Sequence, residues 1–399
     1  MNQRQRKSTT LTVAEQIRRC LLSGCYQEGS WLPPERELAA EYGVSRSIIR
    51  RAIDILAHED LVVRTPRCRP IVRRVRPVRS GAGELRRRTL QLLLWPVSVF
   101  AGSAAILRGI YHALDHTSYR LIVESPRSAG WEQVQQDEAA LLQQAIDEPD
   151  VAGLIIWYMG GERNLPALHR VREAGIPIVF IDRLPPHGFP ADFVGVDNRY
   201  AAEQVVKHLI DCGHRHIAHV SNLDRASTVV QRKEGYRMAL QKAGIPLRPE
   251  YELTDTSATE EHRAENARRL AEQILQLPGP PTAVFTVNDS IALNLLHALR
   301  ERGVQVPEQI SVCGFDGLER WMPGPRFLTT TDQPFERIGE AAARLLLERL
   351  SDEMENVHQH IIYEAPLSVH GSSGRIAQAD SASAAVVSEL NHHTKEGVV

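Results

Sequence analysis

Five side chains stand beside apolar segments at places where they could bind a small polar ligand. Asp182 follows the run PIVFI, Asn288 follows AVFTV and Asp316 follows ISVCGF. Arg232 opens the segment RKEGYRMAL, and Trp157 stands at the end of the run VAGLII. Carboxylates, an amide and a guanidinium bind pairs of vicinal hydroxyls, while an indole covers the apolar face of a sugar ring. These residue types therefore predict a site for a sugar-like ligand.

The segments that carry these side chains alternate between short apolar runs and amphipathic helices, from Thr89 to about His370. Such runs, buried on both faces and separated by helices, predict a parallel, doubly wound α/β fold. About ten units of this kind indicate two lobes rather than one. Ligands in these folds bind beyond the carboxyl ends of the strands. Two alternatives stay open, because Trp157 suits the hydrophobic core equally well and Asp289 suits the cap of a helix beginning at Ser290.

The stretch Leu32 to Val63 has the pattern of two short helices joined by a turn and followed by a strand. Pro33 and Pro34 favour a helix start, Gly43 a tight turn and Ser45 the N-cap of the second helix. Apolar residues at helical spacing predict one buried seam, made of Leu38, Ala39, Val44, Ile49, Ala52, Ile53 and Leu56.

Burial of that seam leaves Arg46, Ser47, Ile48 and Arg50 facing outward at the start of the second helix. A helix whose exposed first turn carries guanidiniums and hydroxyls has what a reader of the DNA major groove needs. The charge distribution agrees with this interpretation. The net charge of −2 combines a balance of +10 in residues 1–88 with −12 in the remainder, so a polyanion is expected to bind at the N-terminus.

The rest of the composition indicates a cytoplasmic protein. The five cysteines are scattered without a CxxC pair, which favours reduced thiols over a disulfide framework. The first residues, MNQRQRKSTT, lack the apolar core of a signal peptide, and no run approaches the ~18 apolar residues of a membrane span.

The sequence motifs do not predict an enzyme. The segment GHRHIAH has metal-like spacing, but alternation places His214 and His216 on one strand face without acidic partners. No nucleophile elbow, P-loop or dinucleotide-binding glycine loop is present. We therefore expect no catalytic residues, no metal site and no cofactor.

Residues 11–75 resemble the winged-helix domain of GntR-type regulators. The resemblance rests on IRRCLLSG, on Gly29 followed by LPPERELA, on GVSR, and on the run from Arg50 to Leu56, which all occur in the family's order. After Val63, the segment RTPRCRPIVRR supplies two short extended pieces around a turn, the usual form of a wing.

The GntR resemblance implies particular DNA contacts. Arg36 would reach a phosphate or a base edge, and Arg46 and Arg50 would enter the major groove. A bidentate pair between an arginine and guanine supplies about 1–3 kcal/mol of discrimination. Ser45 and Ser47 would bond phosphates and fix the register.

Two departures from the GntR pattern affect these expectations. Ile48 stands where family members often have Thr, which exchanges a hydroxyl contact for a methyl contact with thymine. The wing tip, Pro66 to Pro70, lacks the usual glycine and with it the close backbone approach to the minor groove. Arg67 and Arg69 would still supply positive charge there.

Residues 90–371 resemble the sensor domains of LacI/GalR-type regulators, which have the periplasmic-binding-protein fold. The matching segments are VVKHLIDCGHRHIAHVS, RKEGYRMALQKAGI, AVFTVNDSIALNLLHALRERGVQVPEQISVCGFDG and LTTTDQPFERIGEAAARLLLERL. The resemblance implies that Asp182, Arg232, Asn288 and Asp316 line the effector cleft, with Gln333 near a crossover between the lobes. A GntR head on a LacI-type body is the arrangement of AraR-like regulators of sugar use.

The sequence thus predicts an α/β protein with an N-terminal winged helix-turn-helix. The expected domains are residues 1–75 for DNA binding, a basic linker 76–88, a two-lobed sensor 89–371 and a disordered tail 372–399. The predicted function is a homodimeric repressor of carbohydrate genes, which binds a double-stranded DNA operator and a sugar-like effector. Whether the effector induces or co-represses stays open. The alternative is a sugar-binding or sugar-modifying protein whose basic head serves oligomerisation.

Overall fold

The computed structural model describes residues 10, 12–14, 16–17, 20–21, 26, 30–58, 62–63, 69–72, 88–94, 102–127, 131–223, 226–257, 262–351 and 357–376. Contacts divide the chain into a head, Met1–Arg86, and a sensor unit, Arg87–Val399. All but Arg88 of the predicted linker 76–88 lies outside the described residues.

The head is built around two helices whose apolar sides meet. Helices α2 (Glu35–Glu41) and α3 (Arg46–His58) are joined by a turn in which Gly43 has a φ of 60°, a left-handed conformation that favours glycine. Helical residues between Thr10 and Leu21 contribute Val13, Ala14, Ile17 and Leu21 to the same core. Of the predicted seam, Leu38, Ile49, Ala52, Ile53 and Leu56 are buried, while Ala39 and Val44 are partly buried. The predicted helix pair is confirmed.

A small antiparallel sheet completes the head. Strands β1 (Val62–Val63) and β2 (Ile71–Val72) pair with Val62 opposite Val72. The backbone before α2 joins them: the Leu32 N–H donates to the Pro70 carbonyl at 2.8 Å, and the Val72 N–H donates to the Ser30 carbonyl at 2.9 Å. These strands form the stem of a wing, whose tip at residues 64–68 lies outside the described part of the chain.

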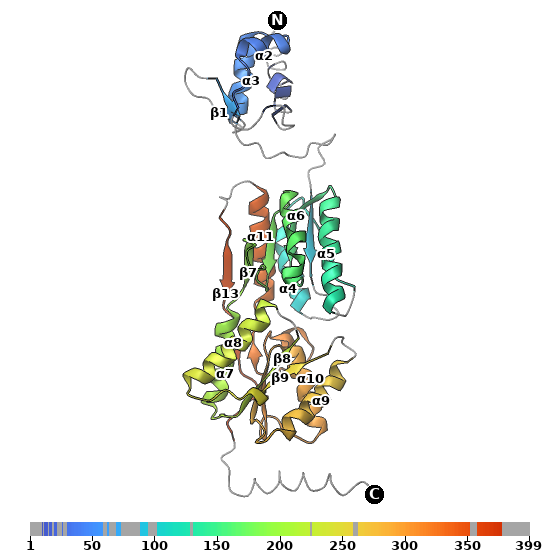
Figure 1. Ribbon diagram of the computed structural model, residues 1–399, viewed down its shortest axis with the longest axis vertical. Helices are drawn as coiled ribbons and strands as arrows, with labels where there is room; N and C mark the ends of the chain where they lie inside the picture. The colour runs from blue at the N-terminus through green and yellow to red at the C-terminus, as the bar shows by residue number, and fades with distance from the viewer. Residues whose placement is uncertain are drawn as a thin grey trace. The chain divides into compact units, whose positions relative to one another are not determined.

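The first lobe of the sensor unit is a six-stranded parallel sheet with the order β13-β7-β6-β5-β3-β4 (Figure 1). Helices α4 and α11 contribute to the hydrophobic core on one face, and α5 and α6 to the core on the other. Because both faces are covered, the central strands β5 and β6 are apolar throughout. The elements are β3 (Thr89–Leu93), α4 (Gly102–Leu114), β4 (Arg120–Glu124), α5 (Trp131–Asp147), β5 (Val151–Ile156), the 3-10 turn η1 (Gly161–Asn164), α6 (Leu165–Glu173), β6 (Ile178–Ile181), β7 (Asp192–Val196), α11 (Phe335–Leu350) and β13 (His360–Tyr363).

Helix α11 belongs to the first lobe although it follows the strands of the second lobe in the chain. Its close packing against α4 depends on two glycines. A Cβ on Gly109 would lie 1.9 Å from the Glu336 carbonyl oxygen, and a Cβ on Gly339 would lie 2.2 Å from the Ile106 carbonyl oxygen. Only glycine lets the two backbones approach in this way.

The second lobe is a four-stranded parallel sheet with the order β11-β10-β8-β9. Helices α7 and α8 pack in one core cluster and α9 and α10 in the other, again forming two helical layers. The elements are α7 (Asn198–Asp211), β8 (Ile217–Asn222), α8 (Ser227–Lys242), the 3-10 turn η2 (Pro249–Tyr251), β9 (Glu252–Asp255), α9 (Arg263–Gln276), β10 (Ala283–Thr286), α10 (Asp289–Glu301), β11 (Ser311–Cys313) and the 3-10 turn η3 (Leu318–Trp321).

Two short strands lie where the chain passes between the lobes. Strand β12 (Thr330–Thr331) precedes α11, strand β14 (Leu367–Ser368) follows β13, and the two pair antiparallel. The predicted two-lobed, doubly wound fold is confirmed, and the apolar runs VAGLII, PIVFI, AVFTV and ISVCGF contain strands β5, β6, β10 and β11.

Two predicted boundaries need correction. Helix α8 begins at Ser227, so Arg232 lies within the helix and does not open it. The predicted tail 372–399 begins too early, because Ser372 and Ser373 are buried and the Val312 N–H donates to the Ser372 carbonyl at 2.7 Å. The packed sensor unit extends at least to Ile376, whose N–H donates to the Cys212 carbonyl at 3.1 Å; residues 377–399 lie outside the described part.

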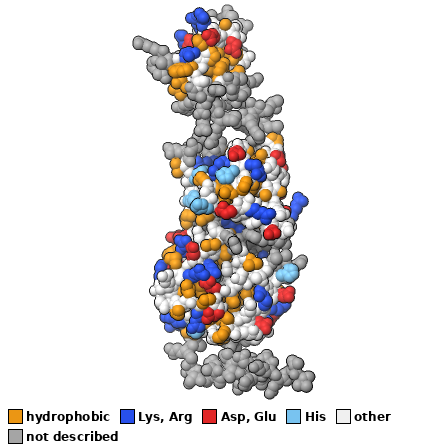
Figure 2. All heavy atoms as spheres, in the orientation of Figure 1, with side chains coloured by type: hydrophobic (Ala, Val, Ile, Leu, Met, Phe, Trp, Pro, Cys, Tyr) orange, Lys and Arg blue, Asp and Glu red, His pale blue; other side chains and the backbone are white. Residues whose placement is uncertain are grey.

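The surface of the described sensor unit carries charges of both signs. Acidic and basic side chains are interspersed on the face shown in Figure 2, so the acidic excess of this unit does not gather there in one patch. None of the helices in the described ranges has the length and hydropathy of a membrane span.

Candidate functional site

Four of the six predicted ligand-binding side chains come together where the two lobes meet. Asp182 directly follows β6 of the first lobe, and Asp316 follows β11 of the second. Arg232 comes from α8, and Gln333 lies between β12 and α11. All four are nearly buried, with exposed fractions between 1% for Gln333 and 6% for Asp316. This geometry is consistent with the prediction that residues following the strands lie close together.

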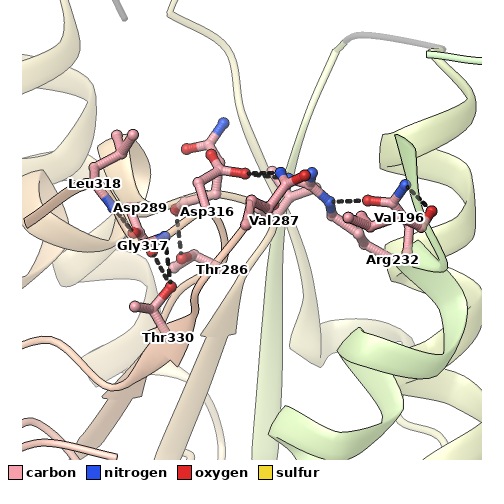
Figure 3. Close-up of polar contacts among 12 residues, drawn as sticks. Val196, Arg232, Thr286, Val287, Asp289, Asp316, Gly317, Leu318 and Thr330 are labelled. Atoms are coloured by element: carbon pink, nitrogen blue, oxygen red, sulfur yellow. Dashed lines mark hydrogen bonds and ion pairs between the residues drawn. The ribbon is translucent and has the colours of Figure 1, made fainter. Parts of the chain in front are cut away.

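Arg232 is the centre of the cluster. Its Nε donates to Asn198 Oδ1 at 2.8 Å, and its Nη1 donates to the Val287 carbonyl at 2.8 Å and lies 3.1 Å from Asp316 Oδ1 (Figure 3). The guanidinium also stacks on the Phe315 ring, 3.7 Å from its centroid. A buried arginine with this many partners is held in one orientation.

Gln333 and Asp182 leave hydrogen-bonding capacity unused. The Gln333 Nε2 donates to Asp316 Oδ1 at 2.8 Å, which links the crossover segment to the second lobe. Within the described residues, Gln333 Oε1 and Asp182 Oδ1 are buried oxygens without a hydrogen-bond partner. Buried polar atoms in folded proteins are nearly always paired, so these two oxygens mark a place that a ligand can satisfy.

Burial also changes the acidity of the carboxyl groups. Desolvation raises the pKa of Asp182 above its ordinary value, and the positive charges of Arg232 and Arg183 partly oppose that rise. Desolvation likewise raises the pKa of Asp316 and of Asp289, whose titrations influence each other. Shifted carboxyl groups gathered in one place are typical of functional sites.

The backbone at two of these positions is strained. Asp182 has a φ of 61° and Asp316 a φ of 124°, both in the region that L-residues rarely adopt. Strain of this kind persists where surrounding packing enforces it, and it concentrates at binding sites.

The helix cap considered for Asp289 from the sequence is provided by Asn288 instead, and α10 begins at Asp289 rather than at Ser290. Asn288 caps α10, because its Oδ1 accepts from the Ile291 N–H at 2.9 Å. Asp289 is fully buried and accepts from the Leu318 N–H at 2.8 Å and from the Thr330 hydroxyl at 2.6 Å (Figure 3). Asp289 therefore holds the turn after Asp316 against the crossover segment, while Asn288 remains a proposed ligand contact.

Of the two roles that its position suggested, the structure shows that of a core residue for Trp157, and its contact with a ligand stays a prediction. It is 8% exposed and belongs to the core of the first lobe. The guanidinium of Arg183 lies over its ring, 5.7 Å from the centroid, and Arg183 directly follows Asp182. The indole thus lies at the edge of the cluster.

Sequence reasoning missed Glu138, a fully buried carboxyl group beneath the loop that carries Trp157. Glu138 Oε1 accepts from the Met159 N–H at 2.6 Å, and Oε2 accepts from Asn164 Nδ2 at 3.0 Å. A Cβ on Gly160 would lie 2.4 Å from Glu138 Oε2, so the loop fits closely around the carboxyl group. An acidic residue in the middle of the amphipathic helix α5 gives no sequence signal that separates it from a solvated one.

We expect Glu138 to make the stability of the sensor unit depend on pH. Desolvation raises its pKa from 4.5 to about 7, so the folded chain keeps a proton that the unfolded chain loses. The free energy of unfolding therefore falls as pH rises from about 4.5 to about 7, by on the order of 3 kcal/mol from this group. Glu138→Gln should show a flatter dependence in denaturant titrations between pH 5 and pH 8.

The control for that experiment is Glu132→Gln, which removes an exposed carboxylate from the same helix. It should follow the pH dependence of the unmodified chain. Parallel curves for Glu138→Gln and the unmodified chain would contradict the assignment.

The predicted DNA-binding residues lie on the helix pair of the head. Arg36, Ser45, Arg46 and Ser47 are exposed, and the Ser45 and Ser47 hydroxyls lie 2.9 Å apart. Ile48 differs from the prediction that it faces outward, because it is partly buried against the core of the head. Only part of its side chain is left for contact with a base.

Arg50 is exposed as predicted but is already paired. Its Nε and Nη2 donate to the two carboxylate oxygens of Glu35 at 3.2 and 2.7 Å. To bind guanine, the Arg50 guanidinium therefore has to break its hydrogen bonds with Glu35 and form new ones with the base. At the wing, Arg69 lies over the exposed Trp31 ring, 5.9 Å from the centroid, whereas Arg67 lies outside the described residues.

Family comparisons match both units of the chain. Residues 9–69 match the model of bacterial regulatory proteins of the gntR family, and residues 206–373 match the periplasmic binding protein-like domain. An arabinose metabolism transcriptional repressor from Halalkalibacterium halodurans is 29% identical over 90% of this chain and 95% of its own length. A repressor of the same description from Geobacillus stearothermophilus is 28% identical over 92% of this chain and 98% of its own length.

Solved structures show the same fold. A complex of the transcriptional regulator CelR with cellobiose covers 86% of this chain and all of its own, with a TM-score of 0.60 and 24% identity. A LacI family regulator from Enterococcus faecium with bound ribose covers 72% of this chain and all of its own, with a TM-score of 0.59 and 22% identity.

The chain is a transcription regulator and not an enzyme. It joins a DNA-binding domain of the gntR family to a periplasmic binding protein-like sensor domain, which is the domain arrangement that the sequence predicted. Over nearly its whole length it is similar to repressors of arabinose metabolism.

Proposed function

We propose that this chain is a homodimeric repressor of carbohydrate genes, which leaves a pseudo-palindromic operator when a sugar binds around Arg232. The observation that supports the proposal best is the buried cluster of Asp182, Arg232, Asp316 and Gln333 at the junction of the two lobes. Because its members come from both lobes and from the crossover, a ligand that completes their hydrogen bonds favours one arrangement of the lobes over another. Its DNA target places the protein in the cytoplasm.

Because the similarity to arabinose metabolism repressors extends over nearly the whole chain, arabinose is the first sugar to test. Exposed arginines and hydroxyls on α2 and α3 support DNA binding by the head. Arg46 and Arg50 are the proposed base readers. The further proposed DNA contacts are Arg36, Ser45, Ser47, Arg67 and Arg69. Two such helices in a dimer would read half-sites about one helical turn apart.

The test is a titration of operator DNA with the full chain, with and without a panel of sugars. We expect one sugar to weaken operator binding, and operator DNA to weaken the binding of that sugar by the same factor. Raising the salt concentration should weaken DNA binding steeply, because phosphate contacts release counterions. Equal sugar affinities with and without operator would contradict induction, and shallow salt dependence would favour the alternative in which the head serves oligomerisation.

A further inference from the structure

Trp31 is an exposed aromatic residue of the head that is not among the proposed DNA contacts. Its side chain is 46% exposed, although the next residue, Leu32, is fully buried. The backbone holds Trp31 against the wing, because Trp31 forms an antiparallel bridge with Ile71 of β2. The neighbouring Leu32 N–H donates to the Pro70 carbonyl at 2.8 Å. The segment before α2 is therefore fixed to the stem of the wing.

This pairing brings the Arg69 guanidinium over the indole. Trp31 and Ile71 lie opposite each other, and Arg69 precedes Ile71 by two residues, so its side chain projects from the same face of the small sheet. Pro70 restricts the backbone of Arg69 to an extended conformation. The Arg69 Cζ lies 5.9 Å from the centroid of the Trp31 ring, within the range of a cation–π contact.

The Arg69 guanidinium keeps its hydrogen-bond donors for a partner outside the head. Its side chain is exposed, and no carboxylate in the described part of the chain forms an ion pair with it. Arg50, by contrast, is paired with Glu35. An aromatic face attracts the cation without using its N–H donors. Arg69 is thus oriented by the indole and can still bind a phosphate.

The Trp31–Arg69 pair lies near the side of the head that carries the proposed base readers. Glu35 at the start of α2 binds Arg50 of α3, so the start of α2 adjoins that side. Trp31 precedes Glu35 by four residues, which places their Cα atoms within roughly 14 Å of each other. The major groove is about 12 Å wide, so a phosphate at its border can contact Arg69 while Arg50 binds a base.

We propose that Trp31 is a positioning residue for DNA binding, whose indole holds the Arg69 guanidinium toward a phosphate of the DNA backbone. The proposal rests on the proposed DNA-binding function and adds a residue to it. An arginine side chain that is ordered before binding loses less conformational entropy when it meets the phosphate. Removal of the indole therefore weakens DNA binding without removing an atom that contacts DNA.

The experiment measures binding of the full chain to a labelled, mixed-sequence duplex of roughly 30 base pairs, about three helical turns, by fluorescence anisotropy at several salt concentrations. A phosphate contact does not depend on base sequence, so this duplex tests it without knowledge of the operator. Arg69→Ala should reduce the slope of log affinity against log salt by about 0.9 per head. Trp31→Ala should weaken binding about 2- to 5-fold, which corresponds to one cation–π contact at an exposed site. Trp31→Phe keeps an aromatic face and should lose less affinity than Trp31→Ala.

A double-mutant cycle separates positioning from other roles of the indole. If Trp31 acts through Arg69, Trp31→Ala has no further effect on affinity or salt slope in the Arg69→Ala background. An equal loss in both backgrounds would overturn the proposal, because the indole would then contact DNA itself or only stabilise the head. Unchanged affinity in Trp31→Ala would overturn it too.

The matched control is Arg300→Ala, which removes an exposed arginine that lies over the Phe327 ring of the sensor unit, 4.4 Å from its centroid. This variant should keep the salt slope of the unmodified chain. If the unmodified chain binds the duplex and Trp31→Ala behaves like it, the positioning role is wrong and the proposed function stands. If the unmodified chain does not bind DNA at any salt concentration, the proposed function fails together with the role of Trp31.

Discussion

Replacement of Arg232 by Met should abolish sugar binding and strongly destabilise the sensor unit. The change leaves Asp316 buried without its counter-ion and removes the donors to Asn198 and to the Val287 carbonyl. Removal of one partner of a buried ion pair costs roughly 3–5 kcal/mol of stability. We expect sugar affinity to fall at least 100-fold by calorimetry and the thermal midpoint of the sensor unit to drop by several degrees.

A second variant keeps this prediction testable if the first folds poorly. Arg232→Met combined with Asp316→Asn removes both charges and should recover part of the lost stability, because no unpaired charge remains buried and asparagine tolerates the positive φ at this position better than an apolar residue. The control is Arg199→Met, which breaks the ion pair between Arg199 and Glu234, whose side chains are 50% and 43% exposed. That change should cost about 0–1 kcal/mol. Equal stability of Arg232→Met and Arg199→Met would contradict the central role of Arg232.

The double change Arg46→Ala and Arg50→Ala should remove specific operator binding. Both side chains are exposed on the first two turns of α3, and each proposed arginine–guanine pair supplies about 1–3 kcal/mol. We therefore expect operator affinity to fall at least 100-fold in fluorescence anisotropy, with a much smaller loss on unrelated DNA. Sugar affinity should not change, because the sugar cluster lies in the sensor unit.

The matched control removes two positive charges elsewhere. Arg199→Ala with Arg344→Ala breaks two exposed ion pairs of the sensor unit and changes the net charge by the same amount. It should keep operator affinity within a few-fold of the unmodified chain. If both double variants lose affinity equally, DNA binding depends on the net charge of the whole chain, and the assignment of Arg46 and Arg50 is wrong.

Much of the candidate site could be predicted because strand ends in parallel sheets converge. Asp182 and Asp316 both follow apolar runs that became strands β6 and β11. The division of roles between Asn288 and Asp289 could not be predicted, because it depends on where α10 begins and on contacts to Leu318 and Thr330 far along the chain.

Hydrophobic periodicity and charge are local properties, so the order of helices and strands, the two-lobed class of the sensor and the basic head could be predicted from the amino-acid sequence. Three other features are visible only in the folded chain: α11 and β13 return to the first lobe, Arg50 pairs with Glu35, and Glu138 supports the Trp157 loop. These arrangements depend on packing between segments distant in the chain, and local patterns do not encode such packing. For the same reason, the unused oxygens of Asp182 and Gln333 became visible only once the lobes were folded.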